Sequence, residues 1–297
     1  MGRAVCKCDT RVAISIMKVA VTGATGFIGR HVLAELESRS VEAVALLRPG
    51  SGGYPWTSRC RVVAFDLNSV PPNSFDLLGR PDILIHLAWS GLPNYYSLHH
   101  FEQELPKQYL FLKGLIESGL KTVVIAGTCF EYGMRSGQLN ENIAPQPILP
   151  YGFAKNALRC QLEYLKRSHP FQLTWARLFY LFGEGQAKSS LFPQIKEAAE
   201  RGNKFFNMSC GEQLRDYLPV DEAARHLVSL ALAKRDNGIV NICSGIPISV
   251  RRLVEEWIKE NRWTIQPNLG HYMYPDYEPM AFWGERKKLT SLLDAIK

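Results

Sequence analysis

The sequence predicts an α/β fold in which a doubly wound, Rossmann-like parallel sheet carries a smaller, sequence-discontinuous lobe. Three observations support this. Short apolar runs alternate with helical patterns up to Leu178. These runs are too apolar for one face to meet water, which is typical of parallel strands covered by helices on both sides. A glycine-rich turn follows the first run, and the alternation loosens after Leu178.

The elements follow from apolar runs bounded by turn residues and from helical spacing between them. The strands expected in the sheet are Val19–Thr22, Val41–Leu47, Arg61–Phe65, Ile83–Leu87, Thr122–Ala126 and Leu173–Leu178. The helices expected between them are Phe27–Arg39, Leu105–Ser118 and Tyr151–Ser168.

Beyond Leu178 the pattern predicts helices at 191–200, 221–232 and 250–261 and a short strand at 239–243. The Pro- and Tyr-rich segment 266–279 is expected to be irregular. We therefore predict a dinucleotide-binding core of residues 17–178 plus 218–245. Residues 179–217 plus 246–297 would form the substrate lobe.

Residues 1–16 differ from the rest of the chain. Arg3, Lys7, Asp9 and Arg11 interrupt any apolar stretch, so the segment makes a poor signal peptide. Met17 runs straight into the first strand and resembles a natural start. We expect residues 1–16 to be a leader that is disordered or not native.

Composition excludes several classes of protein. No apolar run approaches the ~20 residues that span a bilayer, so no membrane partner is expected. The net charge is +7, but the basic residues are scattered, which argues against nucleic acid and suits a small phosphorylated ligand. The seven cysteines, an odd number, suggest reduced thiols in a cytoplasm. No histidine spacing indicates a metal site.

The glycine turn after the first strand predicts a dinucleotide site. Gly23 would allow the tight turn, Gly26 the approach of a pyrophosphate, and Gly29 close packing of helix on strand. The helix N-terminus would offer free N–H groups to the phosphates. Thr25, Phe27 and Ile28, within the turn, complete this part of the expected site. The alternative is a purely structural turn.

The ends of the next strands indicate which cofactor is bound. The second strand ends in Arg48, where NAD-binding proteins usually have an acid for the adenosine ribose. Arginine can pair with a 2′-phosphate, so we expect NADP(H), with NAD(H) possible; the alternative is an exposed loop arginine. Asp66 and Leu67 are placed for the adenine edge. The cofactor would also run along Leu87, Ala88 and Trp89.

Tyr151 and Lys155 form a Tyr-x-x-x-Lys pair at the start of a predicted helix. Residues four apart share a helix face, so the ammonium can reach the region of the phenol. A nearby cation favours the phenolate and would lower the phenol's pKa toward a useful acid/base range. Thr128 ends an apolar strand and would join the pair. Tyr151 and Lys155 would also contact the cofactor.

Together these residues resemble the extended short-chain dehydrogenase/reductase superfamily, in particular its NAD-dependent epimerase/dehydratase branch acting on nucleotide sugars. The resemblance extends over most of residues 17–290. Four further stretches carry it: Thr22–Gly29, Thr128–Gly133, Arg177–Gly183 and Arg215–Asp221. It implies that Thr128, Tyr151 and Lys155 are catalytic and that Arg215 contacts the diphosphate of the sugar nucleotide. It also implies cofactor contact by Phe179 and substrate contact by Tyr180 and Leu191.

Two departures narrow the chemistry. Sugar 4,6-dehydratases of this branch carry Asp-Glu after the threonine, and this chain has Cys129-Phe130, so dehydration is not expected. Tyr180 replaces the usual asparagine of the substrate loop, which puts that contact in doubt. Cys129 and Phe130, which we assign to the substrate site, and Trp89 suggest a relatively apolar pocket, as the methyl group of a deoxysugar needs.

The resemblance therefore implies NADPH-dependent reduction of the 4-keto group of a nucleotide-linked 4-keto-6-deoxyhexose, in deoxysugar biosynthesis for surface polysaccharide or glycosylation. A 4-epimerase with tightly held NAD would use the same three residues. A non-catalytic NAD(P)-binding sensor and a non-sugar carbonyl reductase are further alternatives. The resemblance also implies a homodimer built from the helices at 105–118 and 151–168.

Several residues have simpler structural explanations. Tyr151 could be a first-turn helix residue with Lys155 its solvated neighbour, and Thr128 only the end of a strand. Arg215 could pair on the surface with Asp216 or Asp221. His86 and Trp89 are expected to serve packing rather than catalysis.

Overall fold

The computed structural model describes residues 17–50 and 60–296. The predicted leader, residues 1–16, lies outside the described residues. Seven of the described strands form one parallel sheet in the order β11-β7-β5-β4-β1-β2-β3. The strands are β1 (Lys18–Thr22), β2 (Glu42–Leu47), β3 (Arg61–Ala64), β4 (Ile83–His86), β5 (Thr122–Thr128), β7 (Gln172–Leu178) and β11 (Gly238–Ile242).

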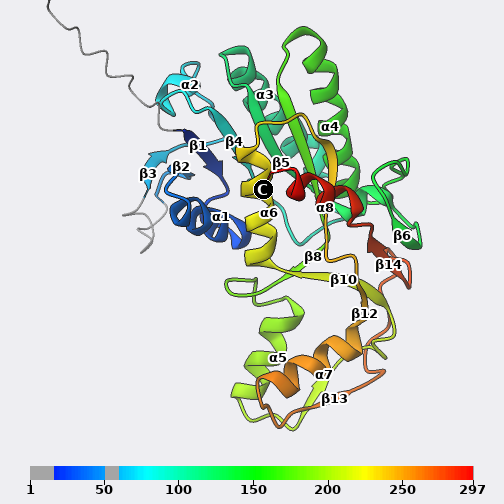
Figure 1. Cartoon of the computed structure of the whole chain (residues 1–297). Coiled ribbons are helices and arrows are strands. Elements are labelled where there is room, and N and C mark those ends of the chain that lie inside the picture. Colours follow the sequence, from blue (N-terminus) through cyan, green and yellow to red (C-terminus); the bar gives the residue numbers. More distant parts are fainter. Residues whose placement is uncertain (1–16, 51–59, 297) are drawn as a thin grey trace, which may run out of the picture.

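Helices cover both faces of this sheet (Figure 1). They are α1 (Phe27–Ser38), α2 (Ser74–Leu77), α3 (Leu105–Glu117), α4 (Pro150–Ser168), α6 (Val220–Leu232) and α8 (Lys287–Asp294). The doubly wound α/β prediction is confirmed. Each predicted strand and helix of the core is present within two residues of its expected ends.

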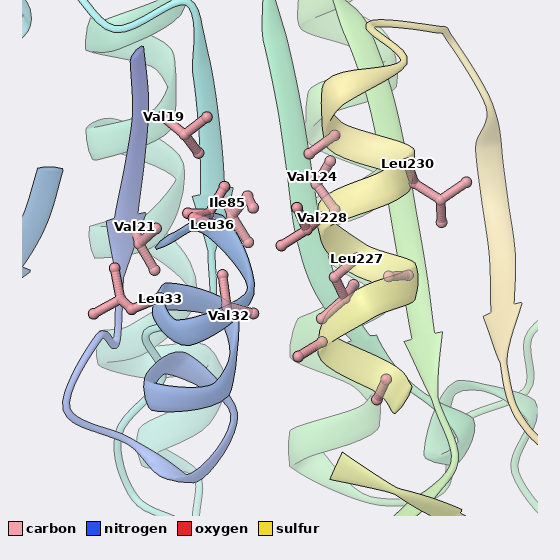
Figure 2. Packing of buried hydrophobic residues seen from close by; sticks show 14 of the residues in the cluster. Val19, Val21, Val32, Leu33, Leu36, Ile85, Val124, Leu227, Val228 and Leu230 are labelled. Atoms are coloured by element: carbon pink, nitrogen blue, oxygen red, sulfur yellow. The ribbon is translucent and has the colours of Figure 1, made fainter. Parts of the chain in front are cut away.

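The apolar runs of the strands are explained by burial on both sides. Val19 and Val21 of β1 point into one core, with α1 and α6, whereas Ala20 between them points into the other, with α3 and α4. Figure 2 shows the first core, where Leu33 and Leu227 from the two helices lie against the sheet. Because side chains alternate across a strand, a strand with two covered faces has to be apolar at consecutive positions.

A second group of elements lies below the large sheet in Figure 1. It contains β8 (Tyr180–Phe182), α5 (Leu191–Glu200), β9 (Phe205–Asn207), β10 (Leu214–Pro219), β12 (Pro247–Ser249), α7 (Val250–Glu260) and β13 (Gln266–Asn268). A separate apolar cluster, which includes Ile195, Trp257 and Ile265, holds it together. The segment expected to be irregular thus contains a short strand, β13, which pairs with β9.

The last residues return to the large sheet. β14 (Phe282–Gly284) pairs with β6 (Gly137–Leu139), and Leu289 of α8 is buried in the core that contains α1 and α6. The predicted boundaries between core and lobe stay a prediction. The C-terminal helix α8, which falls in the predicted lobe, packs on the core.

Candidate active site

The glycine turn closes tightly at the carboxyl end of β1. Gly23 has φ +66°, and a Cβ there would lie 2.8 Å from the carbonyl carbon of Leu87. A Cβ on Gly29 would lie 2.1 Å from the carbonyl oxygen of Gly23. Side chains at these positions would therefore overlap neighbouring backbone atoms, so the tight turn requires glycine at both. Among the described residues no side chain caps α1, so its first N–H groups remain available to an anion.

Thr22 ties the ends of β1 and β4 together beside the turn. Its Oγ1 accepts hydrogen bonds from the backbone N–H groups of Leu87 (3.1 Å) and Ala88 (3.2 Å). The same oxygen lies 2.9 Å from Nδ1 of His86. Burial lowers the pKa of His86 to about 3, so this ring is neutral. His86 thus serves the framework, as predicted. The strand order reverses between β1 and β4, which is where doubly wound sheets bind their ligands.

A groove of about 550 Å³ opens at this point. Its lining includes nine predicted cofactor residues, namely Gly23, Thr25, Gly26, Arg48, Asp66, Leu67, Leu87, Ala88 and Trp89. Phe27, Ile28 and Gly29 form the adjoining first turn of α1. Phe179 is not among the lining residues, because it packs in a buried cluster with Tyr132 and Phe282. The glycine turn and the long groove fit a dinucleotide.

Thr128, Tyr151 and Lys155 come together beside Trp89, which lines the groove, although none of the three is itself among the lining residues. Lys155 Nζ donates a hydrogen bond to the carbonyl oxygen of Ala126 (2.9 Å) and lies 3.9 Å from the centre of the Trp89 ring. Its distance to the centre of the Tyr151 ring is 5.9 Å. Thr128 ends β5, and its side chain is within hydrogen-bonding reach of the Tyr151 phenol. The three residues thus share one small volume.

Burial has the largest influence on the pKa values of Tyr151 and Lys155. It raises the pKa of Tyr151 well above its usual range, with the neighbouring Tyr95 and Glu131 adding to the effect. It lowers the pKa of Lys155 to about 7, against the attraction of Glu131 and Glu104. The expected lowering of the phenol's pKa is therefore not found in this structure, where desolvation by burial has the largest influence on Tyr151.

Aromatic rings surround the Tyr151 phenol. The ring centres of His100 and Tyr95 lie 5.2 and 5.6 Å from that of Tyr151. Those of Trp89 and Phe130 follow at 6.1 and 6.4 Å. The apolar surroundings inferred from Trp89 and Phe130 thus include two further rings, Tyr95 and His100, which were not predicted from the sequence. The paired tyrosines at 95–96, in a loop after a strand, were the available signal.

A buried ion pair between Glu131 and Arg177 lies next to Thr128. Glu131 accepts hydrogen bonds from the Thr128 N–H (2.9 Å), the Trp175 indole (2.8 Å) and Nε of Arg177 (2.8 Å). The side chains of Glu131 and Arg177 are fully buried. Removing either partner would leave an uncompensated charge in the core, which is strongly destabilising. Glu131 therefore fixes the position of Thr128.

A second pocket, of about 270 Å³, lies among the lobe elements. Three predicted substrate residues line it: Tyr180, Leu191 and Arg215. Cys129 is 6% exposed and packs in the cluster that contains Phe179, and neither Cys129 nor Phe130 is among the lining residues of this pocket. The predicted substrate residues are therefore divided between the aromatic surroundings of Tyr151 and the pocket of the lobe.

Arg215 is engaged inside this pocket. Its Nε and Nη2 donate to the same oxygen of Glu278, at 3.2 and 2.8 Å. Its Nη1 donates to the carbonyl oxygens of Leu214 (2.8 Å) and Met280 (3.4 Å). The Tyr180 hydroxyl donates to the other Glu278 oxygen at 2.5 Å. Arg215 is thus only 3% exposed, and a carboxylate stands where a diphosphate was expected.

Arg215 pairs with neither of the two acids that were expected as alternative partners, Asp216 and Asp221. Asp216 accepts backbone hydrogen bonds from Ser244, Gly245 and Gly284 instead, and Asp221 pairs with Arg225 on α6. Glu278, 63 residues further along the chain, is the partner. The sequence offered no signal for this pairing.

Two kinds of feature are absent from the described residues. In residues 17–50 and 60–296 no group of His, Cys, Asp or Glu is arranged to hold a metal ion. Within the same ranges no helix has both the length and the apolar character needed to cross a membrane.

Comparisons with known proteins show which family and fold this chain resembles. The model of the NAD dependent epimerase/dehydratase family matches residues 19–243. A dTDP-6-deoxy-L-talose 4-dehydrogenase (NAD(+)) of Aggregatibacter actinomycetemcomitans is 31% identical, over 91% of this chain and all of the relative. A dTDP-6-deoxy-L-talose 4-dehydrogenase (NAD(P)(+)) of Kitasatospora kifunensis is 27% identical, over 82% of this chain and 79% of the relative.

Among solved structures, MoeE5 in complex with UDP-glucuronic acid and NAD superposes with a TM-score of 0.78. The match is 24% identical and covers 93% of this chain and 92% of MoeE5. At that identity the likeness supports the fold.

Proposed function

The chain belongs to the NAD dependent epimerase/dehydratase family, and within it we propose that the protein is a nucleotide-sugar 4-ketoreductase. It would reduce the C4 carbonyl of a nucleotide-linked 4-keto-6-deoxyhexose. The observation that carries this proposal is the position of Tyr151. Its phenol lies among aromatic rings beside Thr128 and Lys155, next to Trp89, which lines the groove that fits a dinucleotide.

The residues have complementary roles in this reaction. A bound nicotinamide supplies the hydride for C4. Tyr151 gives its proton to the C4 oxygen as negative charge develops there, and its raised pKa keeps it protonated until that moment. The Thr128 hydroxyl donates a hydrogen bond to the same oxygen. Lys155, whose Nζ donates to the carbonyl oxygen of Ala126, would bind the nicotinamide ribose.

The other end of the dinucleotide would be held by the glycine turn and by Arg48. Arg48 lines the groove at the end of β2, and a guanidinium there suits a 2′-phosphate. We therefore propose NADP(H) as the preferred cofactor. NAD(H) is the alternative, because the name of the Aggregatibacter relative specifies NAD(+). Comparison of the Michaelis constants for NADPH and NADH tests this, and a clear preference for NADH would overturn it.

The substrate is proposed from two features. The rings around Tyr151 offer an apolar contact for the methyl group of a 6-deoxysugar, and the relatives named above act on dTDP-6-deoxy-L-talose. Cys129 and Phe130 stand where a dehydratase needs two acids, so dehydration is not expected. Arg215 would hold the diphosphate, in exchange for its contact with Glu278.

The test is incubation with NADPH and a panel of 4-keto-6-deoxysugars linked to dTDP, CDP, UDP or GDP. We expect one of them to oxidise NADPH in a one-to-one ratio with a product reduced at C4. The product's configuration then identifies the sugar. No NADPH oxidation with any member of the panel would contradict the proposal.

A 4-epimerase is the second candidate, because the matching family includes epimerases and the same three residues would serve. It would invert C4 of a nucleotide sugar without net use of cofactor. Epimerisation by the protein as purified, with no NADPH consumed, would favour this candidate over the reductase.

We also propose that the protein acts as a cytoplasmic homodimer, with α3 and α4 at the interface. Leu110 on α3 and Tyr164 on α4 are 63% and 67% exposed, which such an interface would bury. Sedimentation of the purified protein checks this.

A further inference from the structure

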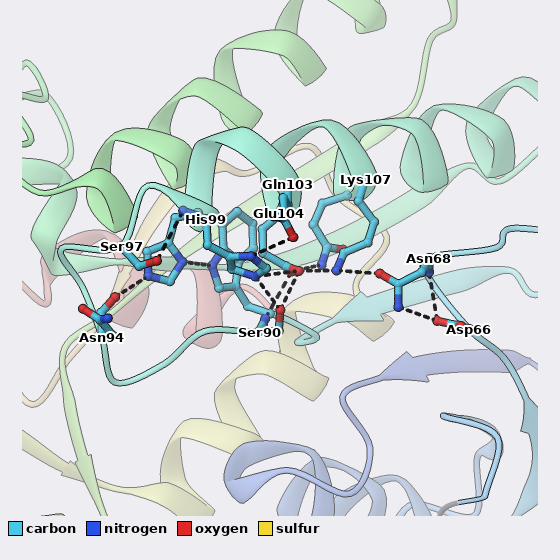
Figure 3. Close-up of polar contacts among 12 residues, drawn as sticks. Asp66, Asn68, Ser90, Asn94, Ser97, His99, Gln103, Glu104 and Lys107 are labelled. Atoms are coloured by element: carbon cyan, nitrogen blue, oxygen red, sulfur yellow. Dashed lines mark hydrogen bonds and ion pairs between the residues drawn. The ribbon is translucent and has the colours of Figure 1, made fainter.

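A line of polar side chains forms the wall of the cofactor groove opposite the glycine turn (Figure 3). It runs along the π-helical turn His100–Glu104 and the start of α3. Neither Glu104 nor Lys107 in this line was predicted to bind the cofactor. At its centre is Glu104, whose side chain is 1% exposed.

The Glu104 carboxylate is fully engaged. One oxygen accepts from the Ser90 hydroxyl (2.6 Å) and from Lys107. The other accepts from the Ser90 N–H (3.1 Å) and from the Gln108 amide (2.8 Å). Burial would raise the pKa of Glu104, but hydrogen bonds from Lys107, Ser90 and Gln108 outweigh it and lower the pKa to about 2. Glu104 is therefore a permanent negative charge that fixes Lys107 in place.

The Lys107 ammonium donates to two acceptors among the described residues and keeps one further N–H donor. Besides Glu104, its Nζ donates to Oδ1 of Asn68 at 3.2 Å. An ammonium has three N–H donors, and within the described residues Nζ has these two partners alone. The side chain is 18% exposed and lines the groove. One N–H of a rigidly positioned cation is thus left for a ligand.

The position of Lys107 indicates which part of the ligand it meets. Asn68 donates in turn to Asp66, which follows β3. In a doubly wound sheet the dinucleotide spans the switch point, one mononucleotide on each half. Thr128 and Tyr151 mark the nicotinamide half, at the end of β5. β3 lies on the other side of β1, so Lys107 faces the adenylate half.

We propose that Lys107 is a cofactor-binding residue that donates to the phosphate of the adenylate half, and that Glu104 is the positioning residue behind it. The inference rests on the dinucleotide of the proposed function and not on its sugar. The competing explanation is that Lys107 merely neutralises the buried charge of Glu104. The two explanations differ in what happens when both charges are removed together.

Binding of 5′-AMP to the full-length protein, measured by calorimetry without sugar or nicotinamide, tests the proposal. Adenosine, which lacks the phosphate, is the comparison ligand. The variants are Lys107→Met, the double variant Glu104→Gln/Lys107→Met, and Lys113→Met. Lys113 is a surface lysine on the same helix, paired with Glu117, and serves as the matched control.

We expect Lys107→Met to bind 5′-AMP about tenfold more weakly, since one charge-assisted hydrogen bond is lost. Adenosine binding should stay within about twofold of the wild-type value. The double variant, which has no unpaired buried charge, should fold and still bind 5′-AMP about tenfold more weakly. Lys113→Met should match the wild type.

Two results would overturn the proposal. Wild-type affinity for 5′-AMP in the double variant would show that Lys107 only compensates Glu104. An equal loss for adenosine would show that the cation does not serve the phosphate. A protein that binds 5′-AMP as proposed but reduces no sugar would leave this inference standing while the proposed function fails.

Discussion

The cofactor groove and the pocket of the lobe differ in what their charged groups are bound to. In the groove, the N-terminus of α1 and one N–H of Lys107 are left available among the described residues. In the lobe pocket, Nε, Nη1 and Nη2 of Arg215 all donate to protein acceptors. The groove is thus ready for an anion, whereas the pocket has to exchange an internal carboxylate for one.

The difference follows from how each region is built. The groove is formed at the carboxyl ends of neighbouring parallel strands, whose register a packed sheet fixes on both faces. The pocket is assembled from short strands, α5 and the segment that carries Glu278. A region held by a few long-range contacts can rearrange at a lower free-energy cost than the centre of a sheet.

Replacement of Tyr151 tests the proposed proton donor beside the groove and carries the largest expected effect. Tyr151→Phe should lower kcat by about two to four orders of magnitude, because the proton donor is lost. Cofactor affinity should change little. Tyr164→Phe, on the exposed side of the same helix, is the control. Retained turnover in Tyr151→Phe would remove the phenol from the mechanism.

A substitution at Gly29 tests whether the groove is as rigid as its geometry indicates. A Cβ there would lie 2.1 Å from the Gly23 carbonyl oxygen. Gly29→Ala should therefore abolish measurable dinucleotide binding or unfold the protein. Gly114→Ala is the control, since a Cβ at Gly114 meets nothing within 4 Å. That helix variant should gain about 0.5–1 kcal/mol in unfolding free energy. Normal binding by Gly29→Ala would mean that the turn can open.

Glu278→Gln tests whether the lobe pocket gives up its internal ion pair when the substrate binds. A neutral amide competes less strongly for Arg215, so the KM for the nucleotide sugar should fall by about three- to tenfold. The KM for the cofactor should stay unchanged. Glu260→Gln, an exposed carboxylate at the end of α7, is the control. An unchanged or raised KM for the sugar nucleotide would argue against Arg215 as the diphosphate anchor.

The pH dependence of stability tests the burial of Lys155 on the groove side and carries the smallest effect. Its pKa is about 7 in the folded protein, against 10.5 as the usual value. Between these values the unfolded chain binds more protons, so the free energy of unfolding rises with pH and the stabilisation is lost as pH falls toward 7. Urea unfolding should show an increase of about 1–2 kcal/mol between about pH 7 and pH 9.

Lys155→Met should remove most of that increase, because the variant has no amine to discharge at this site. An equal pH dependence in wild type and variant would show that Lys155 titrates normally. The lysine would then carry a full charge beside Tyr151 at neutral pH.

Much of the fold, and the grouping of Tyr151 with Lys155, could be predicted because the signals are local. The spacing of Gly23, Gly26 and Gly29 specifies a turn between a strand and a helix. The interval of four between Tyr151 and Lys155 places both on one helix face. Apolar runs at consecutive positions specify strands covered on two faces. Each of these signals lies within a few residues and needs no knowledge of distant parts of the chain.

The tertiary structure alone decided the contacts between distant residues and the ionisation that depends on them. Glu278 meets Arg215 across 63 residues, and nothing near either residue indicates the other. Tyr95 and His100 reach Tyr151 only because their loop folds over α4. The raised pKa of Tyr151 and the lowered pKa of Lys155 come from burial. Desolvation depends on every neighbour that excludes water, and a sequence does not specify that set until it has folded.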